Sequence, residues 1–253
     1  MGIELGLALD RVAFARYLGI EPDEWQKRIL LSPSPKIIVC GGRQIGKSLI
    51  TAILALHRAI FYPGSLILVV APSLRQSSEL FRKIVDAYIR LGSDGPDPLS
   101  WTKLSLEFKN RSRIQCLPSS EETVRGFSSV ALAIFDEAAR IEDQVFAAIL
   151  PSLAVSRGKI MMISTPLTRT GFFAKVWFDG GPEWERYHVP STLCARISAE
   201  FLESERRTLG EWMFRREYLA EFAEDGATFI SFDSLSQVIS SEVRSWNLGF
   251  LGS

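Results

Sequence analysis

Cysteine is scarce in this 253-residue chain, which contains only Cys40, Cys116 and Cys194. Two of the three stand inside apolar, strand-like runs, so we expect buried thiols in a reducing compartment and no disulfide framework. An excess of either charge is also missing, because 29 basic residues balance 29 acidic ones. The chain as a whole is therefore not drawn to a polyanion or a charged membrane, and any contact with nucleic acid must use a local patch.

Long apolar runs are absent as well. No stretch approaches the roughly 20 residues that span a bilayer, and the amino terminus has no basic-then-apolar signal pattern. No internal repeat is present, which sets repeat architectures aside. Hydrophobic residues still make up 47% of the chain, enough for a large core. We expect a soluble intracellular protein that makes no contact with a membrane.

From Lys36 onward, short apolar runs alternate with longer helical patterns, which is typical of βα units in a mainly parallel sheet. The predicted strands are residues 37–40, 66–71, 131–135 and 160–164. The predicted helices are residues 47–61, 76–91 and 143–150. The expected fold class is therefore α/β, a doubly wound and mainly parallel sheet flanked by helices.

Two segments depart from this alternation. A turn-rich stretch at residues 91–99 precedes residues 103–108 and 111–117, which alternate like an antiparallel hairpin near a sheet edge, turning at Lys109 and Asn110. Helical patterns with interleaved charges return at residues 200–209 and 211–221. They predict a small helical lid that follows the sheet.

The segment from Gly41 to Ser48 fits the phosphate-binding pattern G-x4-G-K-[ST]. It follows a predicted strand and opens a predicted helix, where backbone N–H groups and the helix dipole can cradle phosphates. Lys47 is expected to reach the outer phosphates of ATP and Ser48 to bind Mg²⁺, whereas a plain βα turn needs neither side chain. The residues predicted to bind the nucleotide are Gln26, Gly41, Gly42, Arg43, Gln44, Ile45, Gly46, Lys47, Ser48 and Leu49.

A second apolar run ends in Asp136 and Glu137, the form that a second phosphate-site element takes in P-loop enzymes. Asp136 would hold Mg²⁺, and Glu137 would act as general base on the water that attacks the γ-phosphate. Two acids after a strand can also be a helix N-cap, but the phosphate loop favours the catalytic interpretation. Ser164, Thr165 and Pro166 end the next strand, where they either sense the γ-phosphate or form a simple turn.

Four further side chains have open assignments. Arg43 in the phosphate loop, Arg125 in a Val-Arg-Gly turn and Arg140 after the carboxylates compete to stabilise transition-state charge. We favour Arg125 as a finger acting on a neighbouring subunit, with a solvated loop arginine as the alternative. The amide of Gln26 could pair with both edges of adenine, although the residue alone also fits an exposed surface position.

The predicted hairpin is the most basic local patch. Lys109, Arg111 and Arg113, with Lys103 nearby, could meet a phosphate backbone, so they are the predicted DNA contacts. A charged, solvated sheet edge explains the same residues equally well.

Taken together, these motifs resemble the ATPase domain of the large terminase subunit of tailed bacteriophages. The Gly-Arg-Gln-x-Gly-Lys-Ser loop, the Asp-Glu-Ala-Ala strand end and the Ser-Thr-Pro element occur in the order and spacing specific to that family, and the match covers roughly residues 20–225. The segments that carry it are Trp25-Gln26, Gly41 to Ser48, Ala71-Pro72-Ser73, Val124-Arg125-Gly126, Ile134 to Ala139 and Ile163 to Pro166.

The resemblance implies a RecA-like P-loop NTPase of the ASCE class that hydrolyses ATP to drive double-stranded viral DNA into a procapsid. It implies a homo-oligomeric ring, a pentamer, working with portal protein and small terminase subunit in the cytoplasm of the infected bacterial host, and a monomer for the isolated domain. By the same resemblance, Arg125 matches the arginine that reaches the neighbour's nucleotide and Glu137 the catalytic glutamate. Ser164 to Pro166 match the coupling element, and Gln26 matches the adenine-reading glutamine.

One feature departs from the family pattern. Members usually continue into an RNase H-like nuclease domain after a Tyr-x-x-Glu-Phe segment, which matches Tyr218, Glu221 and Phe222, but this sequence ends about thirty residues later. We therefore expect an ATPase core at residues 1–195, a helical lid and linker at residues 196–253, and no DNA-cutting site.

Two other functions remain as alternatives. Ala71-Pro72-Ser73, the Asp136-Glu137 pair and Ser164-Thr165-Pro166 also resemble helicase elements, which would make the chain a nucleic-acid translocase. Nothing after residue 200 reads as the second βα array that such helicases carry. A nucleotide-binding switch without hydrolysis is the third candidate, and the intact catalytic residues argue against it.

Overall fold

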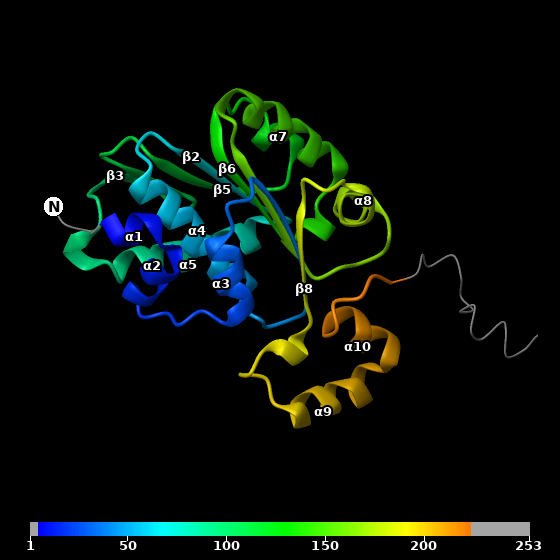
Figure 1. The fold of residues 1–253 in the computed structure, drawn as a ribbon. Coiled ribbons are helices and arrows are strands. Elements are labelled where there is room, and N and C mark those ends of the chain that lie inside the picture. The colour runs from blue at the N-terminus through cyan, green and yellow to red at the C-terminus, as the bar shows by residue number, and fades with distance from the viewer. Residues whose placement is uncertain (1–4, 224–253) are drawn as a thin grey trace, which may run out of the picture.

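A single eight-stranded sheet lies between two layers of helices in the computed structural model, which describes residues 5–223 (Figure 1). The strands are β1 (Lys36–Gly41), β2 (Leu66–Ala71), β3 (Pro98–Trp101), β4 (Ser105–Phe108), β5 (Arg113–Pro118), β6 (Val130–Asp136), β7 (Lys159–Ser164) and β8 (Glu185–Val189). Their order is β3-β4-β5-β2-β6-β7-β1-β8, and from β5 to β8 all neighbours are parallel. The α/β prediction is confirmed.

The helices of the described region are distributed along the whole chain. They are α1 (Leu5–Leu9), α2 (Arg11–Tyr17), α3 (Glu24–Leu31), α4 (Lys47–Phe61), α5 (Leu74–Ile89), α6 (Glu121–Val124), α7 (Asp143–Ser156), α8 (Gly171–Asp179), α9 (Ala199–Leu209) and α10 (Glu211–Glu217), with 3-10 turns η1 (Gly92–Asp94), η2 (Ala138–Arg140) and η3 (Ser191–Leu193). None of those in residues 5–223 is long and apolar enough to cross a membrane.

The central strands are buried on both faces. Along β1, Ile37 and Val39 pack into the cluster under α2 to α5, whereas Ile38 and Cys40 pack into the cluster under α7 and α8. Alternating side chains of a strand point to opposite faces, so a strand covered on both sides is apolar throughout. This is why the four predicted strands are confirmed, each with bounds that differ by no more than one residue at either end.

Two predicted helices end at other residues than expected. The helix predicted for residues 143–150 continues to Ser156, because α7 buries Val145, Ile149 and Leu153, and this packing outweighs the backbone hydrogen bond that Pro151 removes. The hairpin of β4 and β5 is antiparallel and near a sheet edge, as predicted, with β3 as the edge strand and β2 as the next neighbour of β5. The last predicted helix ends at Glu217 rather than at residue 221.

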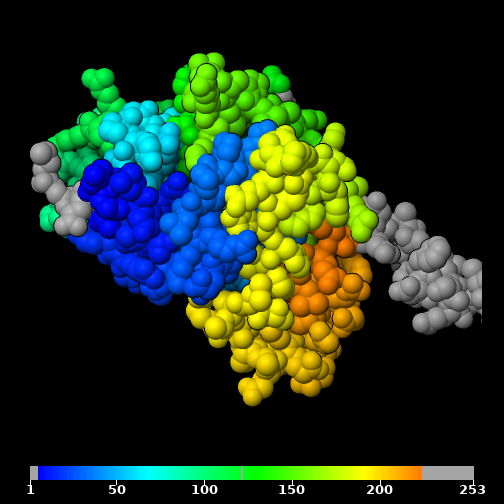
Figure 2. Space-filling model, viewed as in Figure 1, coloured from blue at the N-terminus to red at the C-terminus, as the bar shows by residue number. Residues whose placement is uncertain are grey.

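A small helical unit follows β8. Helices α9 and α10 pack around Leu202, Phe214 and Tyr218, in a cluster separate from the two that cover the sheet. In Figure 2 this yellow and orange segment projects from the lower end of the molecule. The boundary between residues 195 and 196 stays a prediction, and residues 224–253 of the second predicted segment lie outside the described residues.

Candidate active site

The candidate active site lies at the carboxyl ends of three neighbouring strands. Strands β6, β7 and β1 are adjacent, with Asp136 opposite Ile163 and Cys40 opposite Ser164. The phosphate loop leaves β1, the two acids end β6, and Ser164 ends β7. In parallel α/β sheets, ligands bind at this edge, because all the strands deliver their following loops to it.

The phosphate loop has the tight backbone that its glycines predict. Gly46 has a φ of 95° and Gln44 a φ of 58°, both in the left-handed region. A Cβ on Gly42 would lie 2.7 Å from the backbone oxygen of Tyr218 and 2.9 Å from the backbone nitrogen of Ser191. Backbone atoms cannot yield as a flexible side chain can, so only glycine fits where the loop meets the segment after β8.

Lys47 occupies the centre of the site. Its ammonium group is largely buried and donates to the carbonyl oxygens of Gly41 (3.2 Å) and Gly42 (2.8 Å) and to the Thr165 hydroxyl (2.8 Å). It also lies 3.7 Å from the Glu137 carboxylate. Burial lowers the pKa of Lys47, and the carboxylates of Glu137 and Asp136 oppose that shift. The loop, the β6 end and the β7 end thus converge on one cation.

Asp136 has the properties of a cation ligand. It is 6% exposed, and its Oδ1 is buried without a hydrogen-bond partner among the described residues. Burial, with a contribution from the neighbouring Glu137 charge, raises the pKa of Asp136 to about 7, while Lys47 lowers it. An unpaired, buried carboxylate oxygen beside a phosphate loop fits Mg²⁺, and Ser48 at the start of α4 is the second candidate ligand.

Glu137 adopts a backbone conformation that is unusual for its residue type. Its φ and ψ of 49° and 45° are left-handed, which turns the chain sharply after β6. Its Oε2 accepts hydrogen bonds from the Ser164 hydroxyl (3.3 Å) and from the Thr165 backbone N–H (3.4 Å). The structure therefore joins the predicted base to two residues of the predicted coupling element, and the buried Pro166 follows directly.

Gln26 is not a surface residue, so that alternative is wrong. It is 2% exposed, its Oε1 accepts from the Asp23 backbone N–H (2.9 Å), and its Nε2 donates to the Gly46 carbonyl (3.4 Å). The amide caps α3 and contacts the phosphate loop at the same time. Its place beside the loop is compatible with a nucleotide contact, which stays a prediction. Within the loop Ile45 is fully buried, and Leu49 lies half-buried in α4.

Sequence reasoning missed the anchoring of the phosphate loop by the segment after β8. Arg43 pairs with the buried Glu217 of α10, which Arg216 also contacts (2.7 Å). The backbone N–H of Arg43 donates to the Glu217 carbonyl (2.8 Å), and the Ser191 hydroxyl donates to the Arg43 carbonyl (2.8 Å). The charge pattern of residues 211–221 could have suggested ion pairs, but not this partner.

A second such contact involves Arg196. Its guanidinium donates to Asp23 (2.6 Å), which precedes α3, and to the carbonyl of Ile45 in the loop (3.3 Å). Together with Glu217, it ties the chain around α9 and α10 to the phosphate loop. Nothing in the spacing of the sequence indicated either residue, because both contacts join positions more than 150 residues apart.

The other two candidate arginines lie on exposed turns. Arg125 is exposed just after α6, beside Gly126, whose φ is 94°. Arg140 is exposed at the end of η2. An exposed arginine on a turn can serve a neighbouring subunit, so the choice between these two stays a prediction.

The predicted DNA contacts lie at the turn between β4 and β5. Lys109 is paired with Asp97 at 2.8 Å, both side chains being largely exposed. Arg111 has a φ of 67° within the turn, and Arg113 begins β5 with its guanidinium 6.0 Å from the Phe127 ring centroid. The structure brings these three residues together at one sheet end but away from the phosphate loop, which is on a different strand.

No group of three or more His, Cys, Asp or Glu that could hold a metal ion occurs within residues 5–223. The three cysteines are free and buried, as predicted from the composition.

Comparison with known proteins gives consistent matches. Residues 38–237 match the family model described as terminase large subunit, T4likevirus-type, N-terminal. The large terminase subunit of Thermus phage G20c is 27% identical over 258 residues, covering 88% of this chain and 53% of the relative. The chain thus spans about half the length of the relatives it matches.

Solved structures agree with the sequence match. The large terminase ATPase domain of Thermus phage P74-26 superposes with a TM-score of 0.74 at 26% identity, over 83% of this chain and 98% of that domain. The large terminase of a thermophilic bacteriophage in complex with ADP superposes with a TM-score of 0.66 at 16% identity, over 79% of this chain and 54% of that one, which shows a shared fold. On the strength of the matched residues and the RecA-like fold, the chain belongs to the large terminase subunit family, as its motifs indicated.

Proposed function

We propose that this chain binds ATP with Mg²⁺ and hydrolyses it, as the ATPase part of a viral DNA-packaging motor. The observation that carries the proposal is the convergence of Lys47, Glu137 and Asp136, whose buried Oδ1 is unpaired, at one sheet edge. The similarity to the P74-26 large terminase ATPase domain, at 26% identity, supports the same activity.

Each side chain has a chemical role that its geometry supports. The phosphate loop offers backbone N–H groups and a helix N-terminus to the phosphates. Lys47 supplies a positive charge to the outer phosphates. Bound Mg²⁺, held by Ser48 and Asp136, would neutralise developing charge on the phosphate oxygens. Glu137 orients the attacking water and accepts its proton, with its carboxylate positioned by Ser164 and Thr165.

The test of this activity is the variant Glu137→Gln, which keeps the shape of the side chain but removes its basicity. We expect steady-state ATP hydrolysis to fall at least about 100-fold, the lower range of general-base effects, while ATP binding is retained. Glu142→Gln, at an exposed carboxylate that makes no side-chain cap on α7, is the matched control and should hydrolyse ATP normally. Normal turnover in Glu137→Gln would overturn its assignment as the base.

The cellular role follows from the family. Hydrolysis drives double-stranded viral DNA into a procapsid, with portal protein and small terminase subunit as partners and a homo-oligomeric ring as the working form. Membership of the large terminase subunit family supports this role. The same family membership favours packaging over a helicase-like translocase.

DNA contact at the β4–β5 turn is tested by replacing Lys109, Arg111 and Arg113 together with alanine. If each contacts one phosphate, duplex binding weakens and the slope of log affinity against log salt falls by about 0.9 per contact. Lys175→Ala, at an exposed lysine on α8, serves as the control. Salt-titrated binding equal to that of the native chain would leave the patch as a charged edge, with Lys109 merely paired to Asp97.

A further inference from the structure

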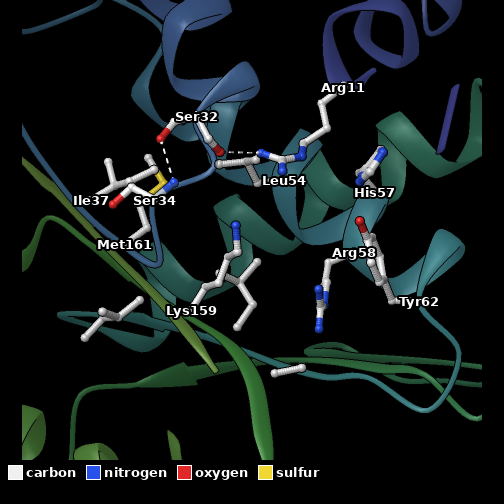
Figure 3. Close-up of a pocket in the computed structure, with 13 residues that line it drawn as sticks. Arg11, Ser32, Ser34, Ile37, Leu54, His57, Arg58, Tyr62, Lys159 and Met161 are labelled. Atoms are coloured by element: carbon white, nitrogen blue, oxygen red, sulfur yellow. Dashed lines mark hydrogen bonds between the residues drawn. The ribbon is translucent and has the colours of Figure 1, made fainter. Parts of the chain in front are cut away.

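A second pocket lies at the amino-terminal edge of the sheet, opposite the candidate active site. It is lined by the first residues of β1, β6 and β7 and by the last turns of α4 (Figure 3). The phosphate loop and Asp136 stand at the other ends of the same strands, roughly 15–20 Å away at about 3.3 Å per residue. The two sites are therefore distinct, although α4 runs from one to the other.

Three cations reach this pocket from three different elements. Arg11 begins α2, Arg58 is in the last turn of α4 and Lys159 begins β7 (Figure 3). Each is half-buried, and none lies within 4.0 Å of a carboxylate oxygen of the described residues. The Glu185 carboxylate accepts hydrogen bonds from the hydroxyls of Ser32 and Tyr187 and pairs with none of the three cations.

The protein partly satisfies these cations with its own backbone. Arg11 donates to the carbonyls of Leu30 (2.7 Å) and Ser32 (3.3 Å), and Lys159 donates to the carbonyl of Pro33 (3.1 Å). The Arg58 guanidinium stacks over the Tyr62 ring at 4.2 Å, but its Nε is buried without an acceptor. All three cations, including the unpartnered Nε of Arg58, thus line the same pocket without a carboxylate partner among the described residues.

Burial and the mutual repulsion of these cations lower the pKa values of Lys159 and Arg58. Burial lowers the pKa of Lys159, and the charges of Arg11 and Arg58 lower it further. Burial likewise lowers the pKa of Arg58, and Arg11 adds to that effect. A solvated basic surface would show neither effect, because water would screen the charges from one another. An anion placed among them would relieve both the repulsion and the missing hydrogen bond.

The pocket has room for such an anion. Its volume of about 70 Å³ is several times the ~10–15 Å³ that a single water needs. Ser32 and Ser34 flank the cations, and Ile37, Leu54 and Met161 form an apolar floor. Arginine forks suit oxyanions, since their planar N–H groups match two oxygens at once.

We propose that this pocket binds a small oxyanion of the phosphate class, held by Arg11, Arg58 and Lys159. The occupant is either free inorganic phosphate or the terminal phosphate of a small monoester, which share the same recognised group. The proposal does not depend on ATP hydrolysis at the opposite edge.

The experiment measures thermal unfolding of the full chain in increasing inorganic phosphate, with sodium chloride adjusted to hold ionic strength constant. All proteins carry Lys47→Ala, so that the phosphate loop contributes little. Arg58→Gln and Lys159→Gln are compared with this background and with Lys175→Gln, which removes an exposed lysine on α8, a helix on the other face of the sheet from α4. The titration is repeated with glycerol phosphate as the monoester.

We expect phosphate to raise the midpoint temperature of the background and of Lys175→Gln by several degrees. Both pocket variants should need at least tenfold more phosphate for the same rise. An equal response to glycerol phosphate would show that the pocket admits a terminal monoester, and a response to inorganic phosphate alone would restrict it to the free anion. A background protein that gains no more from phosphate than from chloride, or pocket variants that respond like the background, would overturn the proposal.

Discussion

Two residues of the active site adopt backbone conformations that their side chains disfavour. Gln44 and Glu137 both have positive φ without being glycine. Each such residue costs on the order of 1–2 kcal/mol, so the surrounding contacts must hold it in place. For Glu137 those contacts are the hydrogen bonds from Ser164 and Thr165. The geometry of the predicted base thus depends on the strand that follows it in the chain.

At the same scale, His57 predicts a dependence of stability on pH. It is 2% exposed, and its Nε2 donates to the Leu7 carbonyl at 3.1 Å. Burial lowers the pKa of His57 from 6.5 to about 4, with a further contribution from the Arg11 charge. Between about pH 6.5 and pH 4, His57 is therefore protonated in the unfolded chain but stays neutral in the folded chain. Stability from this residue is fully present above pH 6.5 and is lost as the pH falls toward 4, by up to about 1.4 kcal/mol per pH unit.

The test compares urea unfolding of the native chain with His57→Gln between pH 7 and pH 4.5. Glutamine can keep the donor to Leu7 but loses the ring contacts with Phe14 and Phe61, so the variant should be less stable at pH 7 by roughly 1–2 kcal/mol. Because glutamine does not titrate, that deficit should shrink as the pH falls. A difference in free energy of unfolding that stays constant with pH would show that His57 is not held neutral.

At the scale of elements, burial decides what the sequence reveals. The strands β1, β2, β6 and β7 are apolar on both faces and could be predicted closely. Strand β8 was missed, because only Tyr187 and Val189 of its five residues are buried, so this short edge strand has no apolar run. It is recognised as a strand by its backbone pairing with β1, and a local sequence pattern does not predict which strands pair.

The contact between the phosphate loop and α10 gives an element-scale prediction. Glu217 is 3% exposed and contacts Arg43, whose side chain is 57% exposed. In a double-mutant cycle with Arg43→Ala and Glu217→Gln, we expect a coupling energy of about 1–2 kcal/mol, since one partner is buried and the other is half in water. Urea unfolding of the native chain, both single variants and the double variant measures it.

The neighbouring pair Arg215–Glu221 is a matched control. It joins the same helix to the residues after it at 2.6 Å, but both side chains are exposed, at 57% and 38%. Exposed pairs contribute a median of about 0–1 kcal/mol, so its cycle should give a smaller coupling energy. Equal coupling in the two cycles would mean that Glu217 does not anchor the loop any better than a surface ion pair.

At the scale of the whole molecule, the strand order assembles the site. The motifs could be located from the sequence because each follows an apolar strand, and their order β6-β7-β1 then places Asp136, Ser164 and the phosphate loop side by side. The contact between Lys47 and Thr165 spans 118 positions, and that between Arg43 and Glu217 spans 174. Such pairs depend on the packing of distant segments, so spacing along the chain could not predict them.

Assembly beyond the single chain is tested through Arg125. It is exposed on the turn after α6, so a ring would let it complete the site of a neighbouring subunit. We expect ATPase activity per molecule to rise with protein concentration in the native chain and to stay at least about tenfold lower in Arg125→Ala. Arg140→Ala, at the competing exposed arginine, should behave like the native chain.

Mixing the two impaired variants then separates action on a neighbour from action within one subunit. Glu137→Gln retains Arg125 but lacks the base, and Arg125→Ala retains the base but lacks the arginine. If Arg125 reaches across an interface, mixed assemblies contain some sites with both groups, so the mixture should recover activity that neither variant has alone. If Arg125 serves its own nucleotide, every site lacks one group and the mixture gains no activity over the separate variants. The same mixture is prepared with Arg140→Ala in place of Arg125→Ala. If Arg140→Ala is impaired alone and recovers activity when it is mixed with Glu137→Gln, the finger is Arg140.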